Sequence, residues 1–357
     1  MPSAGRPRHA HRTGARARAM RIIVTGSIAY DYIMSFPGDF SEHILPDKID
    51  VLSVSFLVES LRREPGGCAA NIAYNLALLG ERPTVMATVG ADFAYDYERL
   101  KTHGVDVSLI RTMPDDTTAS FFVSTDRRNR QIASFYVGAM AAATELSFHD
   151  LGVEDVALAI IAPNAPEAMV KYVRECKALA VPYVYDPSQQ IVRLSASDLI
   201  DGIRGSRIFI ANEYEFALVH EKTGLDADTV RALTDVLIVT HGEHGSVIHD
   251  GDTAHAIPAA SPTAEVDPTG VGDAYRAGVV FGFLRNLPWP VAGRVGALAA
   301  IYALEVLGTQ EQRYTAGEFL DRYAANFGNP PAELAQAMHQ ALRRSHGASS
   351  TSIGATR

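Results

Sequence analysis

The feature that most constrains this chain is the regular alternation of short apolar runs with helix-like segments. The clearest helix covers 68–79, where apolar residues recur at helical spacing and Gly80 provides the stop. After Asp273 the pattern is helical almost to the end of the chain. Because strands that alternate with helices pair in parallel, we predict an α/β fold with a mostly parallel, helix-covered sheet. The predicted buried strands are 21–25, 83–89, 156–161, 182–185, 208–211 and 236–240.

Two stretches interrupt this alternation, at 35–61 and at 118–136. The second is typical of two strands around a polar turn at 126–130, and the first shows apolar alternation in places. Together they predict a small β element that stands off the main sheet. In an enzyme such an element commonly acts as a lid that excludes water from the reaction. The alternative is a surface hairpin without a role in function.

Composition excludes several classes of protein. The 357 residues are 47% hydrophobic, enough for a full core, and no apolar run reaches the length of a membrane span. With 41 acidic against 32 basic side chains the net charge is −9, which disfavours nucleic acid as a partner. Two cysteines form neither a disulfide framework nor a cysteine-based zinc site. They fit a reducing compartment, so we predict a cytoplasmic protein.

The two ends differ from the body of the chain. Residues 1–19 carry five arginines and no acidic side chain, and we predict a disordered basic extension. A translation start at Met20 and an organellar presequence are the alternatives, whereas a secretory signal lacks its apolar segment. We predict one domain over 20–340, with the lid contributed by 35–61 and 118–136, and a disordered tail at 341–357.

The segment 267–278 carries the strongest chemical signal. Gly270 and Gly272 let successive backbone amides point at one spot, and a helix that begins there adds its positive end, so the segment predicts an anion site. Asp273 at the head of that helix is suited to accept a proton from an attacking hydroxyl. A plain helix cap is the alternative for Asp273. P-loop, dinucleotide-binding, zinc-hydrolase and serine-hydrolase motifs are absent from the sequence.

Four segments resemble, in order, the motifs of the ribokinase family, also called the phosphofructokinase B family. Residues 267–273 are similar to its D-T-x-G-A-G-D signature, with Pro268 and Val271 as departures. The other three are a G-G pair followed four residues later by Asn, an N-x-x-E, and a T-x-G-x-x-G, at 66–71, 212–215 and 240–245. The resemblance covers 21 to about 325. It implies a ribokinase-like three-layer sandwich with a small β lid.

Other segments are similar to the bacterial nucleoside kinase and adenosine kinase-like branch: 26–31, 43–46, 62–63 and 138–140. The resemblance implies an ATP-dependent nucleoside kinase that phosphorylates the 5′-hydroxyl of a ribonucleoside, with adenosine as the expected acceptor. A sugar kinase of the ribose or fructose type and an inactive nucleoside-binding protein are the alternatives. The oligomeric state, monomer or homodimer, stays open.

The resemblance also implies roles for individual residues. Asp273 is expected to be the general base, and the amides of Gly270, Val271 and Gly272 to stabilise the transferring phosphoryl group. Asp31 is expected to accept hydrogen bonds from the ribose hydroxyls. The remaining expected substrate-binding residues near the ribose are Gly66, Gly67 and Asn71, with Asn71 supplying an amide to a hydroxyl.

On the nucleotide side, Asn212 and Glu215 are expected to organise Mg²⁺ around the ATP phosphates. Thr240, Gly242 and Gly245 are expected to border the nucleotide; a surface turn is the alternative for Gly245. A monovalent cation such as K⁺, held by backbone carbonyls, is a further expectation.

The lid is expected to supply the base contacts, with Phe122, Phe135, Tyr136 and Met140 as candidates. Arg62 and Arg63 either clamp phosphate or are solvated.

Overall fold

A nine-stranded sheet forms the centre of the structure, a computed structural model that describes residues 21–347 except 45, 129 and 153–154. The strand order is β13-β12-β11-β10-β9-β8-β1-β4-β5, and all neighbours are parallel except the pairs that β12 forms with β11 and β13. The strands are β1 (Arg21–Thr25), β4 (Pro83–Gly90), β5 (Asp106–Met113), β8 (Val156–Ile161), β9 (Tyr183–Tyr185), β10 (Ile208–Asn212), β11 (Val236–Thr240), β12 (Ser246–Asp250) and β13 (Thr253–Ile257). The six predicted buried strands are thus confirmed as the central strands.

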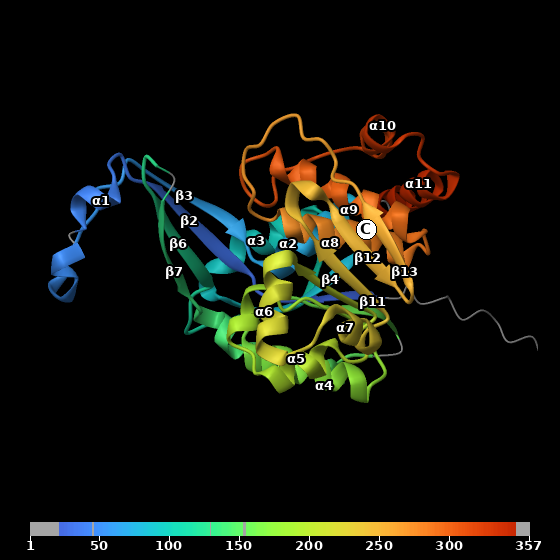
Figure 1. The fold of residues 1–357 in the computed structure, drawn as a ribbon, viewed down its shortest axis with the longest axis horizontal. Coiled ribbons are helices and arrows are strands. Elements are labelled where there is room, and N and C mark those ends of the chain that lie inside the picture. The colour runs from blue at the N-terminus through green and yellow to red at the C-terminus, as the bar shows by residue number, and fades with distance from the viewer. Residues whose placement is uncertain (1–20, 45, 129, 153–154, 348–357) are drawn as a thin grey trace, which may run out of the picture.

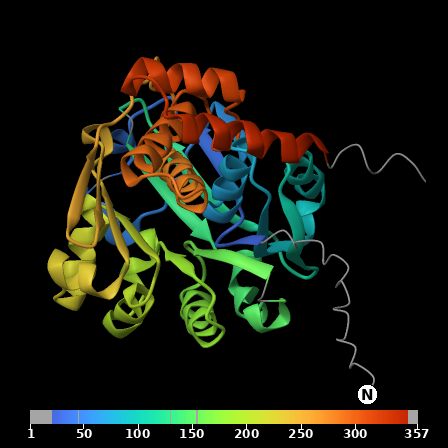
Figure 2. The ribbon, with the colours of Figure 1, turned by 90° about the vertical axis from the view of Figure 1, so that its right-hand side faces the viewer.

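Helices cover both faces of this sheet, so the predicted three-layer α/β sandwich is confirmed (Figures 1 and 2). One face is covered by α2 (Cys68–Leu78), α8 (Val271–Leu284) and α9 (Trp289–Leu304), with α10 (Ala316–Phe327) and α11 (Ala332–Gly347) outside them. The other face carries α4 (Pro166–Ala178), α5 (Ala196–Ile203), α6 (Glu213–Thr223) and α7 (Ala227–Leu233). Helix α3 (Ala94–Thr102) packs beside β5.

The central strands are mainly apolar because both of their faces are buried. In β1, Ile22 and Val24 pack into the core under α2 and α8, whereas Ile23 packs into the core under α4 and α5. All three side chains are at most 5% exposed. A continuous apolar run is therefore what a strand in this position requires.

The carboxyl ends of the parallel strands lie along one edge of the sheet. The strand order reverses around β1, which has β4 on one side and β8 on the other. In open α/β sheets ligands bind outside these ends, at the point of reversal. The residues that follow β1, β9, β10 and β11 therefore lie where a ligand is expected.

A separate four-stranded sheet, here called the lid sheet, projects from this edge (Figure 1). Its order is β3-β2-β6-β7, with β2 (Ala29–Ser35), β3 (Ser60–Gly66), β6 (Ala119–Thr125) and β7 (Gln131–Tyr136). The predicted hairpin around 126–130 is confirmed by β6 and β7. The Asp126 carboxylate fixes its turn by accepting the amides of Arg128 and Arg130.

The prediction for 35–61 is wrong in detail. The lid strands lie at the two ends of this stretch, and the connection between them contains α1 (Phe40–His43) and a 3₁₀ segment, Pro46–Val51. The connection is held by its own aromatic cluster, in which Phe36 stacks on Phe40 with ring centroids 5.4 Å apart and Phe56 packs against both. Phe56, in the alternating part of this stretch, thus belongs to the aromatic cluster and not to a strand.

The two ends of the chain lie partly outside the residues that the structure describes. The basic extension at 1–19 lies outside the described residues, as does 348–357. Helix α11 continues to Gly347, so the first part of the segment predicted as a disordered tail is helical. No described helix is both long enough and apolar enough to cross a bilayer.

Candidate active site

The N-termini of α2 and α8 meet at the edge of the sheet, and each begins at a glycine. Gly67 has φ +90° and a Cβ there would lie 2.6 Å from the carbonyl oxygen of Ser27, so no other residue fits without backbone movement. Gly270 caps α8 with φ +78°. The two helices pack against one another, and Asn71 of α2 contacts Asp273 of α8 near their N-termini. Their first turns therefore present amides and side chains to a common space.

The anion loop, residues 267–272, is held open by its own side chains. Asp267 accepts the amide of Thr269 at 2.9 Å and that of Gly308 at 3.1 Å. The amide of Val271 makes only a 3.4 Å bond to the Pro268 carbonyl, and within the described chain nothing accepts a hydrogen bond from the amides of Gly270 or Gly272. Free donors at a helix N-terminus are suited to bind an anion.

Asp273 lies in the first turn of α8 and is buried. Its Oδ2 accepts a 2.9 Å hydrogen bond from Nδ2 of Asn71, in the first turns of α2. Burial raises the pKa of the Asp273 carboxyl, and the Arg276 guanidinium and the Asn71 hydrogen bond oppose that rise. A carboxylate held in this way is oriented and basic, as a general base requires.

The orientation of Asn71 is dictated by a chain of buried polar groups. An arginine has donors only, so Arg99 Nη2, 2.7 Å away, fixes the Gln310 amide with Oε1 towards the guanidinium. Gln310 Nε2 then donates to Asn71 Oδ1 at 2.8 Å, and Thr309 Oγ1 lies 2.8 Å from the same oxygen. Only the Nδ2 side of Asn71 is left to face Asp273. We call Asn71, Thr309 and Gln310 the amide clamp.

Asp31 lies across the site on β2 of the lid sheet. A Cβ on Gly66 would lie 2.6 Å from its Oδ2, so glycine at that position leaves room for the carboxylate. Burial, followed by the charges of Asp267 and Asp273, raises the pKa of Asp31 to about 6. Gly66 directly precedes Gly67, the N-cap of α2, and Asn71 of α2 contacts Asp273, so both predicted carboxylates lie at the same end of α2.

The register of the lid sheet decides which aromatic side chains face this site. Phe121 pairs with Asp31 across the β2–β6 ladder, and paired residues point to the same face. Phe122 pairs with Tyr32 and stacks on it, with ring centroids 4.8 Å apart. Phe122 therefore lies on the face opposite Asp31. This position does not support its predicted place in a base pocket beside Asp31, because a one-residue step along a strand reverses the face.

The other lid candidates divide in the same way. Phe135 pairs with Phe121 and shares the Asp31 face, whereas Tyr136 pairs with Ser120 on the opposite face and donates to Asp116 at 3.1 Å. Met140 is buried against Ala29 and Ala119, which lie two residues from Asp31 and Phe121 and so on their face. The Asp31 face thus carries an apolar surface beside the carboxylate.

Arg62 and Arg63 also lie on opposite faces of the lid sheet. Arg63 lies over the Tyr30 ring at 4.4 Å, on the face opposite Asp31. Arg62 is 4.0 Å from Glu64, which pairs with Asp31. Of the two, only Arg62 is placed to meet a ligand.

On the nucleotide side, the predicted residues follow β10 and β11. Asn212 and Glu215 form a capping box at the start of α6, in which the Asn212 amide donates to Glu215 Oε2 at 2.8 Å. Glu215 Oε1 accepts from Ser188 Oγ at 2.8 Å. Both oxygens are thus engaged, and nowhere in the described chain do three or more His, Cys, Asp or Glu side chains form a metal site.

Thr240 ends β11, and Gly242 and Gly245 form the turn into β12, closed by a 2.8 Å bond from the His241 amide to the Gly245 carbonyl. The space around Gly242 is open, whereas a Cβ on Gly245 would meet the Ile257 carbonyl oxygen at 2.0 Å. Glycine at 245 is therefore required by its positive φ and by the close approach of β13, which is a structural reason that needs no nucleotide. Thr240 and Gly242 remain placed at the ligand-binding edge.

Several residues of the site were not predicted from the sequence. Arg276 has a sequence signal, since it and Asp273 are the two charged residues of the otherwise uncharged α8. Thr309 and Gln310 come from the loop after α9 and carry no motif. Phe121 lies one position from the predicted Phe122, and only the register separates them.

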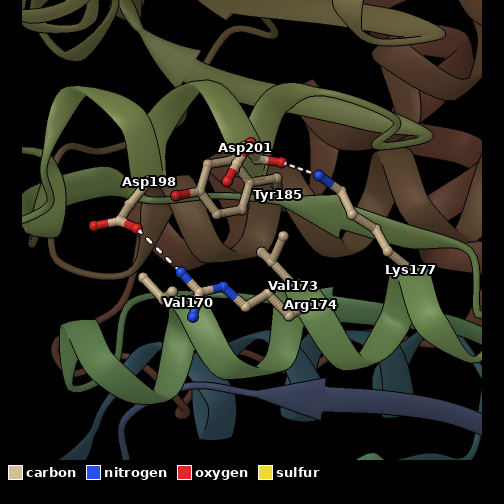
Figure 3. Close-up of a pocket in the computed structure, with 7 residues that line it drawn as sticks. All are labelled: Val170, Val173, Arg174, Lys177, Tyr185, Asp198 and Asp201. Carbon is tan, nitrogen blue, oxygen red and sulfur yellow. Dashed lines mark hydrogen bonds and ion pairs between the residues drawn. The ribbon is translucent and has the colours of Figure 1, made fainter.

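A different hollow lies between α4 and α5 (Figure 3). Its volume is about 260 Å³, and its cations are already satisfied: Arg174 is 3.9 Å from Asp198, and Lys177 bonds the Asp201 carbonyl. None of the predicted site residues lines it. We therefore assign the active site by its chemistry, at the carboxyl edge of the sheet.

Comparison with known proteins identifies the family of the chain. The sequence profile of the pfkB family of carbohydrate kinases matches residues 29–316. The chain belongs to this family. The predicted resemblance is confirmed, and as a member of a kinase family the protein is a phosphotransferase that acts on an alcohol group.

Similar members of the family include nucleoside kinases. The structure of Burkholderia thailandensis nucleoside kinase in complex with inosine is 36% identical, with a TM-score of 0.78, and the match covers 87% of this chain and 99% of that chain. The structure of the same enzyme in complex with ADP-inosine is 37% identical, with a TM-score of 0.76, and the match covers 87% of this chain and 97% of that chain. A nucleoside kinase of Methanocaldococcus jannaschii is 30% identical over 305 residues, 85% of this chain and 96% of its own length.

Proposed function

We propose that this protein is an ATP-dependent nucleoside kinase that phosphorylates the 5′-hydroxyl of a ribonucleoside. The observation that carries the proposal is the position of Asp273, whose carboxylate is held beside the free amides of the anion loop and shares its site with Asp31. A base, an anion site and a ribose acceptor are the parts that transfer of a phosphoryl group to a sugar hydroxyl needs.

The proton moves to Asp273 during transfer. Oδ2 accepts the Asn71 bond, so we assign Oδ1 as the oxygen that takes the proton from the 5′-hydroxyl. The hydroxyl oxygen forms a bond to the γ-phosphorus of ATP as the bond between that phosphorus and the β,γ-bridging oxygen breaks, and ADP leaves with the electron pair. Amides of Gly270 and Gly272 stabilise the negative charge on the transferring group.

The acceptor is recognised at the lid sheet. Asp31 accepts the ribose hydroxyls, as a carboxylate does for two neighbouring donors. The nearby apolar surface of Phe121, Phe135 and Met140 suits a flat base, and free sugars have no group to cover it. The Burkholderia relative is described with inosine, which favours a purine nucleoside; adenosine, expected from the sequence, stays a prediction.

ATP is proposed to bind beside α6 and the β11–β12 turn, near Asn212, Thr240 and Gly242. The oxygens of Glu215 both accept hydrogen bonds, so this side chain fits Mg²⁺ through water more readily than as a direct ligand. Mg²⁺ would neutralise phosphate charge in the bound ATP. A K⁺ site formed by backbone carbonyls near the anion loop stays a prediction, as do the cytoplasmic location and the choice between monomer and homodimer.

A coupled assay of ADP release tests the proposal, with adenosine, inosine, guanosine, cytidine, ribose and fructose as acceptors at saturating MgATP. We expect turnover with ribonucleosides, purines foremost, and little with free sugars. Turnover confined to ribose or fructose would replace the nucleoside kinase by a sugar kinase of the same family. No turnover with any acceptor, despite nucleoside binding by calorimetry, would indicate an inactive binding protein.

A further inference from the structure

The second charged side chain of α8, Arg276, lies one helical turn after Asp273 and is largely shielded from solvent. Its side chain is 11% exposed. Removing a guanidinium from water costs several kcal/mol unless it is paired, so a buried arginine needs fixed partners. The remaining residues of α8 are uncharged and pack against α2 and α9. The position of Arg276 is therefore tied to its partners in the site.

The anchoring partner is Asp186, which directly follows β9 and is fully buried. Arg276 Nη2 donates to Asp186 Oδ1 at 2.9 Å, and Nε contacts the other carboxylate oxygen. This two-point contact uses the planar fork of the guanidinium, which lysine lacks. The Asp186 backbone amide is itself bonded to the Ile161 carbonyl at 3.0 Å, so the anchor belongs to the central sheet.

The remaining arm of the guanidinium reaches the catalytic end of α8. Nη1 lies 3.7 Å from Asp273 Oδ1 and would be 2.6 Å from a Cβ on Gly272. Within the described chain no acceptor forms a hydrogen bond with Nη1. The free arm thus lies beside the anion loop and next to the carboxylate oxygen that we assign to proton transfer.

We propose that Arg276, anchored by Asp186, is a positioning residue that keeps Asp273 ionised and turned towards the anion loop. The inference rests on the proposed function and deepens it, since it names what supports the general base. Asn71 holds Oδ2 from α2, and Arg276 supports Oδ1 from within α8. The two contacts fix both oxygens of one carboxylate.

The charges around Asp273 make this support necessary. The titratable groups that act on it are Asp31 on β2, Cys68 on α2, Glu215 on α6 and Asp186 after β9. Among the residues that the structure describes, the cation that offsets their charge is Arg276. Buried carboxylates that share a site cannot all ionise at neutral pH without a compensating charge. Without Arg276 the general base would hold its proton at the pH where the wild type is active.

The test is the pH dependence of kcat/KM for the nucleoside, measured with the full chain from pH 5 to 10. In Arg276→Met we expect the acid limb to move up by about 1 to 3 pH units, with turnover largely recovered at high pH. Arg276→Lys keeps the charge but not the two-point anchor, so we expect its acid limb to lie close to that of the wild type while kcat is lower.

A matched control exists at the other end of the same helix. Arg285 is paired with Glu81 through two contacts, and their side chains are each 13% exposed. Arg285→Met removes a similarly buried pair about three helical turns from Asp273. We expect a lower melting temperature and an unchanged acid limb.

A lower kcat in Arg276→Met with an acid limb superimposable on that of the wild type would overturn the proposal and leave Arg276 a structural residue. If that variant does not fold, Arg276→Met combined with Asp186→Asn removes the stranded carboxylate, and the same criterion applies to it. A wild type that phosphorylates no nucleoside would refute the proposed function instead, so the two failures are distinct.

Discussion

The two sides of the active site are built in opposite ways. The floor, where α2 and α8 begin, is a set of buried polar groups with each partner fixed: Arg99, Gln310, Asn71 and Asp273 follow one another in hydrogen-bond contact. The lid sheet is held mainly by backbone hydrogen bonds between its strands. Its apolar side chains are partly exposed to solvent, and Phe135 is 47% exposed. The contrast indicates that the floor sets the chemistry and the lid sets the acceptor.

The largest expected effect comes from the floor. Asp273→Asn keeps the shape and the Asn71 contact but cannot take a proton. We expect kcat to fall by about 10²- to 10⁴-fold or more, with little change in nucleotide affinity. Steady-state kinetics and calorimetric ATP binding check this, and near-normal turnover would mean that Asp273 is not the base.

Disruption of the amide clamp should have the second largest effect on kcat. Asn71→Ala frees Asp273 Oδ2 and leaves Gln310 Nε2 without its acceptor, so we expect a loss of roughly 100-fold in kcat from misplacement of the base. Asn75→Ala is the matched control. Asn75 is also buried on α2, where its Oδ1 accepts Gln312 Nε2 at 2.9 Å and its Nδ2 donates to the Asn71 backbone carbonyl, so its side chain bonds neither the Asn71 side chain nor Asp273.

Both variants should lose about 1–3 kcal/mol of stability, measured by denaturant unfolding, because each leaves a buried donor unpaired. Only Asn71→Ala should lose turnover. Equal kinetic losses in the two variants would reduce the clamp to a contribution to stability.

The lid should show a smaller effect, and on KM rather than kcat. Phe121→Ala removes an aromatic surface on the Asp31 face, and we expect KM for a nucleoside to rise roughly tenfold, equivalent to about 1.4 kcal/mol of stacking. Phe122→Ala, one residue along the strand, should leave KM within about twofold. The reverse ranking of the two variants is incompatible with the register described above.

The smallest effect expected is on stability, at Asp31. Its pKa is raised to about 6 in the folded protein, so this group favours folding below the unfolded pKa near 4 and loses that contribution as pH rises through 6. Asp31→Asn should therefore melt a few degrees higher than the wild type at pH 8. The difference should shrink towards pH 4.

Scanning calorimetry of the unliganded protein at the two pH values checks this prediction. Nucleoside affinity should fall in the same variant. Asp31 would then lower the stability of the protein while it contributes to binding of the substrate. A melting temperature lower than that of the wild type at pH 8 contradicts it.

The sequence by itself determined the central sheet. The buried strands were predictable because both faces of each are covered, which favours a short apolar run between turn residues, shorter than a helix of the core. Outer strands such as β5, β12 and β13 were not predicted, because their polar and apolar residues mix as in loops. The anion loop and Asp273 were found because a backbone amide site needs glycines at a fixed spacing, which is a local requirement.

What only the tertiary structure decided depends on contacts between distant segments. The contact of Asn71 with Asp273 spans 202 residues and that of Gln310 with Asn71 spans 239, so no local pattern records them. The choice of Phe121 over Phe122 depends on the register between β2 and β6, which changes the face at every residue. A motif such as the anion loop can be identified from neighbouring residues. The orientation of a catalytic side chain depends on partners that are distant in the sequence and meet only in the folded protein.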